Sequence, residues 1–162
     1  MSVRGLSAAG HSAEFSAPKR PHKCASAAMR GVNPIVTVDS RRQNVFGWAY
    51  VAIDRDGAVN VDHSGDFVSR PEELEAAAYR FVLMSRRGDV DHSCETISEL
   101  IESIIFTPDK QRALGLPPGT IPVGWWVGFH VRDPRVWRRV ESGSLTAFSI
   151  AGRWRRTATS AI

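Results

Sequence analysis

Few cysteines and no long apolar run occur in this sequence, and these absences exclude several protein classes. Cys24 and Cys94 are the two cysteines among 162 residues, so there is neither a disulfide framework nor a CxxC zinc pattern. No apolar stretch approaches the roughly 20 residues that a membrane-spanning helix needs. Met1 to Gly10 contain one arginine and no long apolar stretch, so we expect no secretory signal and a reducing, intracellular setting.

The positive charge is concentrated in the first part of the chain. The formal net charge is +4 and the sequence pI is about 9.6. Residues 1–44 carry seven Lys and Arg against two acids, whereas residues 45–162 carry fourteen bases against fifteen acids. The second part is therefore nearly balanced, and a nucleic-acid partner or a membrane partner is not expected for it.

Residues 1–33 are rich in Ser, Ala, Gly and Pro and show little apolar periodicity. Such a segment buries too little surface to offset the entropy of ordering it, so we expect a disordered basic tail. A docking arm for an acidic partner and a nucleic-acid-binding tail are the alternatives. The sequence thus predicts three parts: the tail over 1–33, a folded domain over 34–156, and a short C-terminal tail over 157–162.

Alternating and helical patterns divide the folded domain into strands and helices. Val45–Ile53 alternates, with Phe46, Trp48, Tyr50 and Ala52 on one face, which predicts a strand. The turn residues of Asp54–Gly57 follow, and we expect Val59–Val68 to return as the hairpin partner. A helix is expected next, with Ser69 and Glu72 at capping-box spacing, Pro71 in its first turn, and Gly88 as its stop.

The remaining patterns complete an α+β domain. Ile97–Phe106 fits helical spacing but is rich in Ile, so helix and strand both stay open. Thr107-Pro108 opens a helical turn that Gly115 closes, and Asp133-Pro134 opens a helix that Gly143 ends. Ile121–Val131 and Leu145–Trp154 are expected as strands. We therefore expect a mainly antiparallel, barrel-like sheet that is flanked by helices.

Several residues could perform chemistry, but their types alone do not single out a site. Ser149 lies in an apolar strand, where most serines are ordinary polar residues, and the hydrolase pattern GxSxG is absent. Of the five histidines, His92 stands between Asp91 and Ser93 just after a glycine, and His130 is most simply a residue at a strand end. Cys94 is better explained as a small core thiol than as a nucleophile.

Two acidic clusters offer oxygen ligands, yet neither has metal-site spacing. One is Asp62, His63 and Asp66, and the other is Asp89, Asp91 and His92. Neither matches an EF-hand or a zinc motif, so polar turn residues account for them. We expect no metal and no cofactor.

A series of segments from about Val45 to Arg156 resembles one known family. They are, in order, VFGWA at 45–49; Asp62 with Gly65-Asp66; ELE at 73–75 with AAY at 77–79; GDVDH at 88–92; LIES at 100–103; PVGWWVG at 122–128; Asp133-Pro134 with Trp137; and Gly143 with FSIAG at 148–152. On these residues the chain resembles the XkdF-type phage serine proteases. That group is similar to prohead proteases, whose fold is that of the herpesvirus assemblins.

The resemblance implies a catalytic pair. His92 matches the histidine block and Ser149 matches the serine block, so the family pattern assigns them as general base and nucleophile. Backbone N–H groups of Gly152 and Arg153 are the implied oxyanion donors, and the alternative for this stretch is a solvated basic end. Position 151 is alanine where the pattern has glycine.

The third catalytic member departs from the family pattern. It often follows the serine strand in prohead proteases, but no Asp, Glu or His follows Ser149 here. Glu102 and then Asp66 are the alternatives, because both lie in matching segments. A solvent-facing charge on a strand is the simpler explanation of Glu102.

The resemblance also implies a biological role. It is that of a serine endopeptidase for prohead maturation, which cleaves scaffold and major capsid or portal precursor proteins, and also itself. The implied setting is the host bacterial cytoplasm, inside assembling proheads, with a homodimer as an open question. The alternative is a catalytically inactive capsid-assembly or scaffold module from a decayed or truncated prophage copy.

Overall fold

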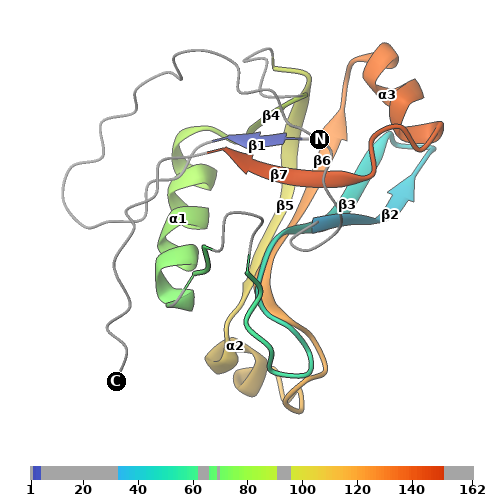
Figure 1. Ribbon diagram of the computed structural model, residues 1–162. Coiled ribbons are helices and arrows are strands. Elements are labelled where there is room, and N and C mark those ends of the chain that lie inside the picture. The colour runs from blue at the N-terminus through green and yellow to red at the C-terminus, as the bar shows by residue number, and fades with distance from the viewer. Residues whose placement is uncertain (1, 5–32, 62–65, 69, 91–95, 152–162) are drawn as a thin grey trace.

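Seven strands form a barrel in the part of the chain that the structure describes (Figure 1). The computed structural model describes residues 2–4, 33–61, 66–68, 70–90 and 96–151. The strands are β1 (Ser2–Arg4), β2 (Asn33–Asp39), β3 (Asn44–Ile53), β4 (Arg87–Asp89), β5 (Ser98–Phe106), β6 (Val123–Val131) and β7 (Ala147–Ala151). Their order around the barrel is β1-β4-β5-β6-β3-β2-β7.

All neighbouring strands are antiparallel except β1 and β7, which are parallel. In the described part of the chain three helices accompany the barrel: α1 (Pro71–Met84), α2 (Pro108–Ala113) and α3 (Pro134–Glu141). In Figure 1, α1 and α3 lie on opposite sides of the long strands β5 and β6. The expected α+β fold with a mainly antiparallel, barrel-like sheet is confirmed.

None of the helices in the described residues is long and apolar enough to cross a membrane.

The predicted strand over 45–53 is confirmed as β3, with one correction to its faces. Val45, Gly47 and Ala49 are buried, and the residues between them are partly exposed, as alternation requires. Ala52 is also buried, so it does not share a face with Phe46 and Trp48 as predicted. The register of β3 against β6 shifts between Trp48 and Tyr50 and again before Ile53, which moves Ala52 to the inner side.

The expected hairpin partner Val59–Val68 is not a strand where the structure describes it. The turn does form, and Ile53 and Val59 make a single bridge. Beyond this bridge, two side-chain amides bind the backbone of Val51. Asn60 Nδ2 donates a hydrogen bond to the Val51 carbonyl oxygen (2.9 Å), and the Val51 N–H donates one to Asn33 Oδ1 (3.3 Å). Because these amides satisfy Val51, no further strand ladder is needed there.

The helix after this loop is confirmed, but its predicted ends are wrong. α1 begins at Pro71 after the N-cap Arg70, with no side-chain cap, so the Ser69–Glu72 capping box does not start it; Ser69 itself lies outside the described residues. The helix ends before Gly88. The N–H groups of Ser85 and Arg86 both bond to the Phe81 carbonyl at 3.0 Å, and Arg86 has a φ of 57°. Gly88 instead lies buried in β4.

The ambiguous run over 97–106 is a strand, β5, because it pairs with β6 along most of its length. Helical spacing of its isoleucines is therefore overridden by pairing across the barrel. The caps of α2 and α3 follow the prediction. Thr107 Oγ1 accepts a bond from the Lys110 N–H, and Asp133 accepts bonds from the N–H groups of Arg135 and Val136.

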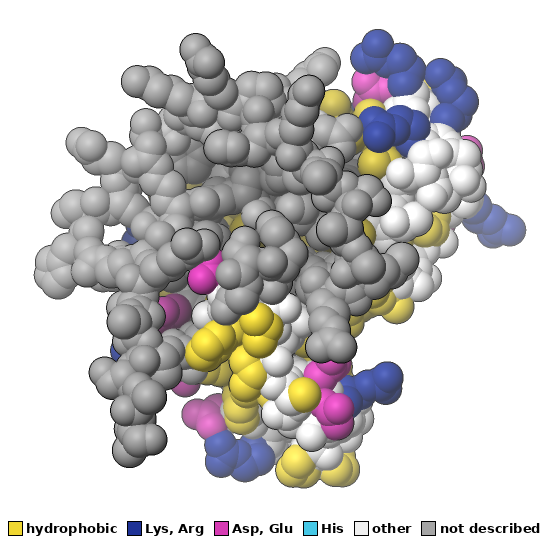
Figure 2. Space-filling model, viewed as in Figure 1, with side chains coloured by type: hydrophobic (Ala, Val, Ile, Leu, Met, Phe, Trp, Pro, Cys, Tyr) yellow, Lys and Arg dark blue, Asp and Glu magenta, His cyan; other side chains and the backbone are white. Residues whose placement is uncertain are grey.

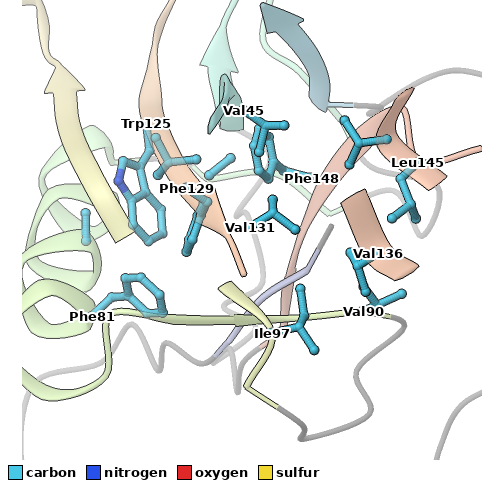
Figure 3. Packing of buried hydrophobic residues seen from close by; sticks show 14 of the residues in the cluster. Val45, Phe81, Val90, Ile97, Trp125, Phe129, Val131, Val136, Leu145 and Phe148 are labelled. Carbon is cyan, nitrogen blue, oxygen red and sulfur yellow. The ribbon is translucent and has the colours of Figure 1, made fainter. Parts of the chain in front are cut away.

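Aromatic side chains fill the barrel interior and attach α1 to it (Figure 3). Phe81 of α1 meets Trp125 edge-on, with ring centroids 5.5 Å apart, and also meets Phe129 at 6.4 Å. Phe129 in turn contacts Phe148 of β7 at 5.9 Å. The one polar atom of Trp125 is satisfied, since its Nε1 donates to Ser103 Oγ at 2.9 Å. This core fixes the orientation of β7, which carries the candidate nucleophile.

β1 has no counterpart in the sequence prediction, which placed no strand before Asn33. Three residues are too few to give a periodic signal, and β1 owes its conformation to the strands on either side of it. Residues 5–32 lie outside the described residues, and so do residues 157–162. The predicted tails over these stretches stay predictions.

Candidate active site

Ser149 lies on the outer face of the barrel, exposed to solvent. Its neighbour Phe148 is 3% exposed and packs in the core, and Ile150 also packs against the core. Since successive side chains of a strand point to opposite faces, Ser149 is turned outward between them. The side chain of the predicted nucleophile is therefore accessible from solvent.

The strand register brings Asp89 into the same row as Ser149. Ser2 of β1 is paired with Ser149 on one side and with Asp89 of β4 on the other. Two strand spacings thus separate Asp89 from Ser149, or about 10 Å between their Cα atoms. A Cβ on Gly88 would meet Ser98 Oγ and the Phe129 ring, so Gly88 faces the core and Asp89 faces outward. Asp89 and Ser149 thus lie on the same side of the sheet, where Ser149 is exposed and Asp89 is buried.

Asp89 is 2% exposed despite its carboxylate. Burial of a carboxylate costs free energy unless hydrogen bonds or charges compensate it, so such groups are often retained at functional sites. From the sequence alone, Asp89 is explained as a polar turn residue. Its position in the GDVDH segment at 88–92, near the candidate base, is the sequence feature that makes it a further candidate.

The other predicted site residues are placed differently or fall outside the described residues. His92, Gly152 and Arg153 lie outside them; β4 and β7 end shortly before these residues. Glu102 lies in the middle of β5, where it pairs with Gly128 of β6. The β5 residue that pairs with Gly88 is Ser98, four residues before Glu102 along the strand.

Glu102 is therefore not brought into the row of Ser149, because β4 and β1 stand between β5 and β7. Asp66 is half-buried in the short segment 66–68 that precedes α1.

Other polar clusters lie away from Ser149. A surface hollow at the β2–β3 turn is lined by Arg41, Arg42 and His130, among others, at the end of β2 opposite to its contact with β7. The His130 Nδ1 is 2.9 Å from the Arg42 carbonyl oxygen and 3.0 Å from Asn44 Oδ1. These contacts fit the interpretation of His130 as a residue that fixes a strand end.

Charged groups also link the helices at the surface. Lys110 Nζ of α2 bonds to Glu75 Oε1 (2.5 Å) and Tyr79 OH (2.6 Å) of α1. The hydrogen bonds from Lys110 and then Tyr79 lower the pKa of the Glu75 carboxyl. Figure 2 shows basic side chains gathered over α3, where Arg135, Arg138 and Arg139 are exposed.

Within the described residues, no group of three or more His, Cys, Asp or Glu side chains is close enough to hold a metal ion. The chemistry that the described residues offer is that of a hydroxyl nucleophile on a barrel strand, with a buried carboxylate in the same row.

Comparison with known proteins shows the family of the chain. Residues 32–157 match the sequence profile of the family described as "Putative phage serine protease XkdF". The chain is 31% identical over 91 residues to the phage-like element PBSX protein XkdF of Bacillus subtilis (strain 168), which covers 56% of this chain and 32% of that protein. It is also 31% identical over 93 residues to the protein YqbD of the same strain, covering 57% of this chain and 27% of YqbD.

The chain thus spans about a third or less of the length of these curated relatives. No solved structure matches it.

Proposed function

Because the chain belongs to the XkdF family of phage serine proteases, we propose that it is a serine endopeptidase that acts in prohead maturation, with Ser149 as its nucleophile. The observation that carries the proposal is the outward, exposed position of Ser149 between two core-facing residues of β7. A nucleophile must reach a peptide carbonyl from solvent, and this position permits it.

In the proposed mechanism, His92 takes the hydroxyl proton of Ser149 as the oxygen attacks the scissile carbonyl, and later returns a proton to the leaving amine. Backbone N–H groups of Gly152 and Arg153, which directly follow β7, would bind the oxyanion. The result is an acyl-enzyme that water hydrolyses.

We place Asp89 ahead of Glu102 and Asp66 as the carboxylate that orients His92. Asp89 is buried, lies in the row of Ser149, and is three residues before His92 in the chain. Asp89 would be a positioning residue, since it acts on the histidine and not on the substrate. Asp89→Asn is expected to lower kcat at least tenfold and to change the pH profile of kcat/KM, whereas Glu102→Gln leaves both unchanged. Equal effects of the two substitutions would contradict this assignment.

The proposed substrates are scaffold and major capsid or portal precursor proteins, cleaved inside proheads in the bacterial cytoplasm. Support comes from the family, which is one of phage proteases, and from the name of the relative, a protein of a phage-like element. Self-cleavage belongs to the same proposal.

Co-expression with the scaffold and capsid proteins of the phage tests the proposal. Ser149→Ala is expected to reduce cleavage by roughly 10³-fold or more, since triad residues contribute at least that much. Ser40→Ala, an exposed serine at the far end of β2, is the matched control and should cleave like wild type. If wild type and Ser149→Ala give the same uncleaved products, the inactive capsid-assembly module is the better description.

A further inference from the structure

β1 fills the gap between the two strands that flank the candidate site (Figure 1). Ser2, Val3 and Arg4 pair with Ser149, Ile150 and Ala151 of β7, and Ser2 and Val3 pair with Asp89 and Gly88 of β4. Without β1, β4 and β7 would each present an open edge to the other. The barrel is closed at this seam by three residues.

The attachment of β1 is short compared with the β3–β6 and β5–β6 pairs, and similar in length to the β2–β7 and β4–β5 pairs, which each pair at two positions. β3 and β5 each pair with β6 at eight positions, whereas β1 pairs at three positions with β7 and at two with β4. Residues 5–32 separate β1 from β2 along the chain. A short strand held by few hydrogen bonds opens more readily than the strands of a core.

β1 also lies where a peptide added as a strand between β4 and β7 would lie. Peptides commonly bind proteins as an added strand, where backbone hydrogen bonds supply affinity and side-chain positions supply specificity. The Ser2 backbone lies directly beside Ser149 and between it and Asp89. An extended peptide in this register would bring its backbone alongside the proposed nucleophile.

We propose that the gap between β4 and β7 is a binding cleft for an extended peptide, and that β1 occupies it as an intramolecular competitor. The proposal rests on the proposed protease function, in which the bound peptide is the substrate. A ligand would run parallel to β7 and antiparallel to β4, as β1 does. While β1 is in place, the Ser149 side chain is exposed to solvent, but no peptide can pair with β7 beside it.

The register also predicts what the cleft selects. The position of Val3 is flanked by Gly88, which is buried, and by Ile150, which packs against the core. A ligand residue at this position would face apolar surroundings, so an apolar side chain is favoured and a charged one is excluded. The preceding position lies in the outer row of Ser149 and Asp89, and tolerates polar residues.

A binding assay on the Ser149→Ala chain tests the cleft without cleavage. The probe is a fluorescent peptide with the sequence of residues 1–10, MSVRGLSAAG. Val3→Pro in the protein removes a backbone donor and cannot be accommodated in a strand paired on both sides. The peptide should bind Ser149→Ala/Val3→Pro at least tenfold more tightly than Ser149→Ala alone, because the tethered competitor is lost. Ala8→Pro is the control and should leave the affinity unchanged.

Peptide specificity gives a second comparison. A probe with aspartate in place of its Val3 should lose at least tenfold in affinity for the Val3→Pro protein. Equal binding of both peptides, equal affinity for both proteins, or no binding to either protein would overturn the proposal. A Val3→Pro chain that fails to fold would also overturn it, since β1 would then be an integral strand of the barrel.

Hydrogen exchange of the Ser149→Ala chain provides an independent reading. The amide of Val3 should exchange much faster than those of β6, and excess peptide should speed it further by displacing β1. Exchange of Val3 together with β6 would contradict the proposal. These measurements of binding and exchange need no catalysis, so they separate the two proposals. Peptide binding without cleavage by wild type would refute only the protease function. Cleavage by wild type, with peptide affinity unaffected by Val3→Pro, would refute only the cleft.

Discussion

Gly47 shows how one missing side chain sets the distance between two strands. A Cβ at this position would lie 2.2 Å from the Pro34 carbonyl oxygen, 3.0 Å from the Ile35 Cα, and 3.1 Å from the Phe148 ring. Two of these three atoms belong to the backbone of β2, which cannot turn away as a flexible side chain could. Glycine is therefore required for β2 to pack where it does, next to the strand that carries Ser149.

Gly47→Ala is expected to destabilise the protein by about 2 kcal/mol or more, because β2 must move away from β3. Urea unfolding followed by tryptophan fluorescence measures the change. Gly57→Asn is the control: Gly57 has a φ of +85° and nothing within 4 Å of a Cβ, and asparagine tolerates that backbone conformation. A loss at Gly47 no larger than that at Gly57 would contradict the packing argument.

The helix α3 illustrates how a local sequence signal produces an element with a measurable pH dependence. Asp133 caps its N-terminus, with its Oδ1 accepting from the Arg135 N–H at 2.7 Å and from the Val136 N–H at 3.3 Å. The side chain of Arg135 also bonds to this carboxylate. These hydrogen bonds, that of the Arg135 side chain foremost, lower the pKa of Asp133 from 3.8 to about 2.

A group with a lowered pKa in the folded state stabilises the protein above its unfolded pKa and ceases to do so as the pH falls through its folded pKa. The contribution of the Asp133 charge is therefore present above about pH 4 and is lost between there and about pH 2. Asp133→Asn keeps a capping oxygen but does not titrate. The unfolding midpoints of wild type and Asp133→Asn should differ most at pH 5 and converge toward pH 2; a constant difference would exclude the charge as the cause.

The whole molecule depends on the aromatic core that joins α1 to the barrel. Phe81 is 1% exposed and contacts the rings of Trp125 and Phe129, which lie on β6. Through Phe129 and Phe148 the same core reaches β7. The position of Ser149 is thus supported by packing that extends across the barrel.

Phe81→Ala is expected to lower the free energy of unfolding by roughly 3–5 kcal/mol, from lost burial and the cavity left behind. Leu83→Ala, on the same helix at 78% exposure, should change it by less than about 0.5 kcal/mol. Chemical denaturation of the two variants and wild type gives the comparison. Similar small losses at both positions would mean that α1 does not contribute to the core.

The candidate site was only partly accessible to sequence reasoning. Family-matching segments singled out Ser149 and the block that contains Asp89, and the carboxylates predicted from the sequence were Glu102 and Asp66. Glu102 and Ser149 are separated by β4 and β1, a relation that strand order creates and that spacing along the chain does not reveal. The outward orientation of Ser149 follows from the core position of Phe148, which is likewise a tertiary fact.

The sequence by itself determined the local features: the alternation that makes β3, the caps of α2 and α3 at Thr107 and Asp133, and the apolar residues of the core. These depend on neighbours a few residues away, whose side-chain periods and capping bonds are written in the chain. Only the tertiary structure decided that Ser98–Phe106 is a strand, that the described residues Val59–Val61 meet β3 at a single bridge, and that β1 lies between Asp89 and Ser149. Strand pairing joins residues that are far apart in the sequence. Because its hydrogen bonds are made by backbone groups that nearly every residue carries, the sequence does not mark which strands pair. The closure of the barrel decides which strand lies next to which.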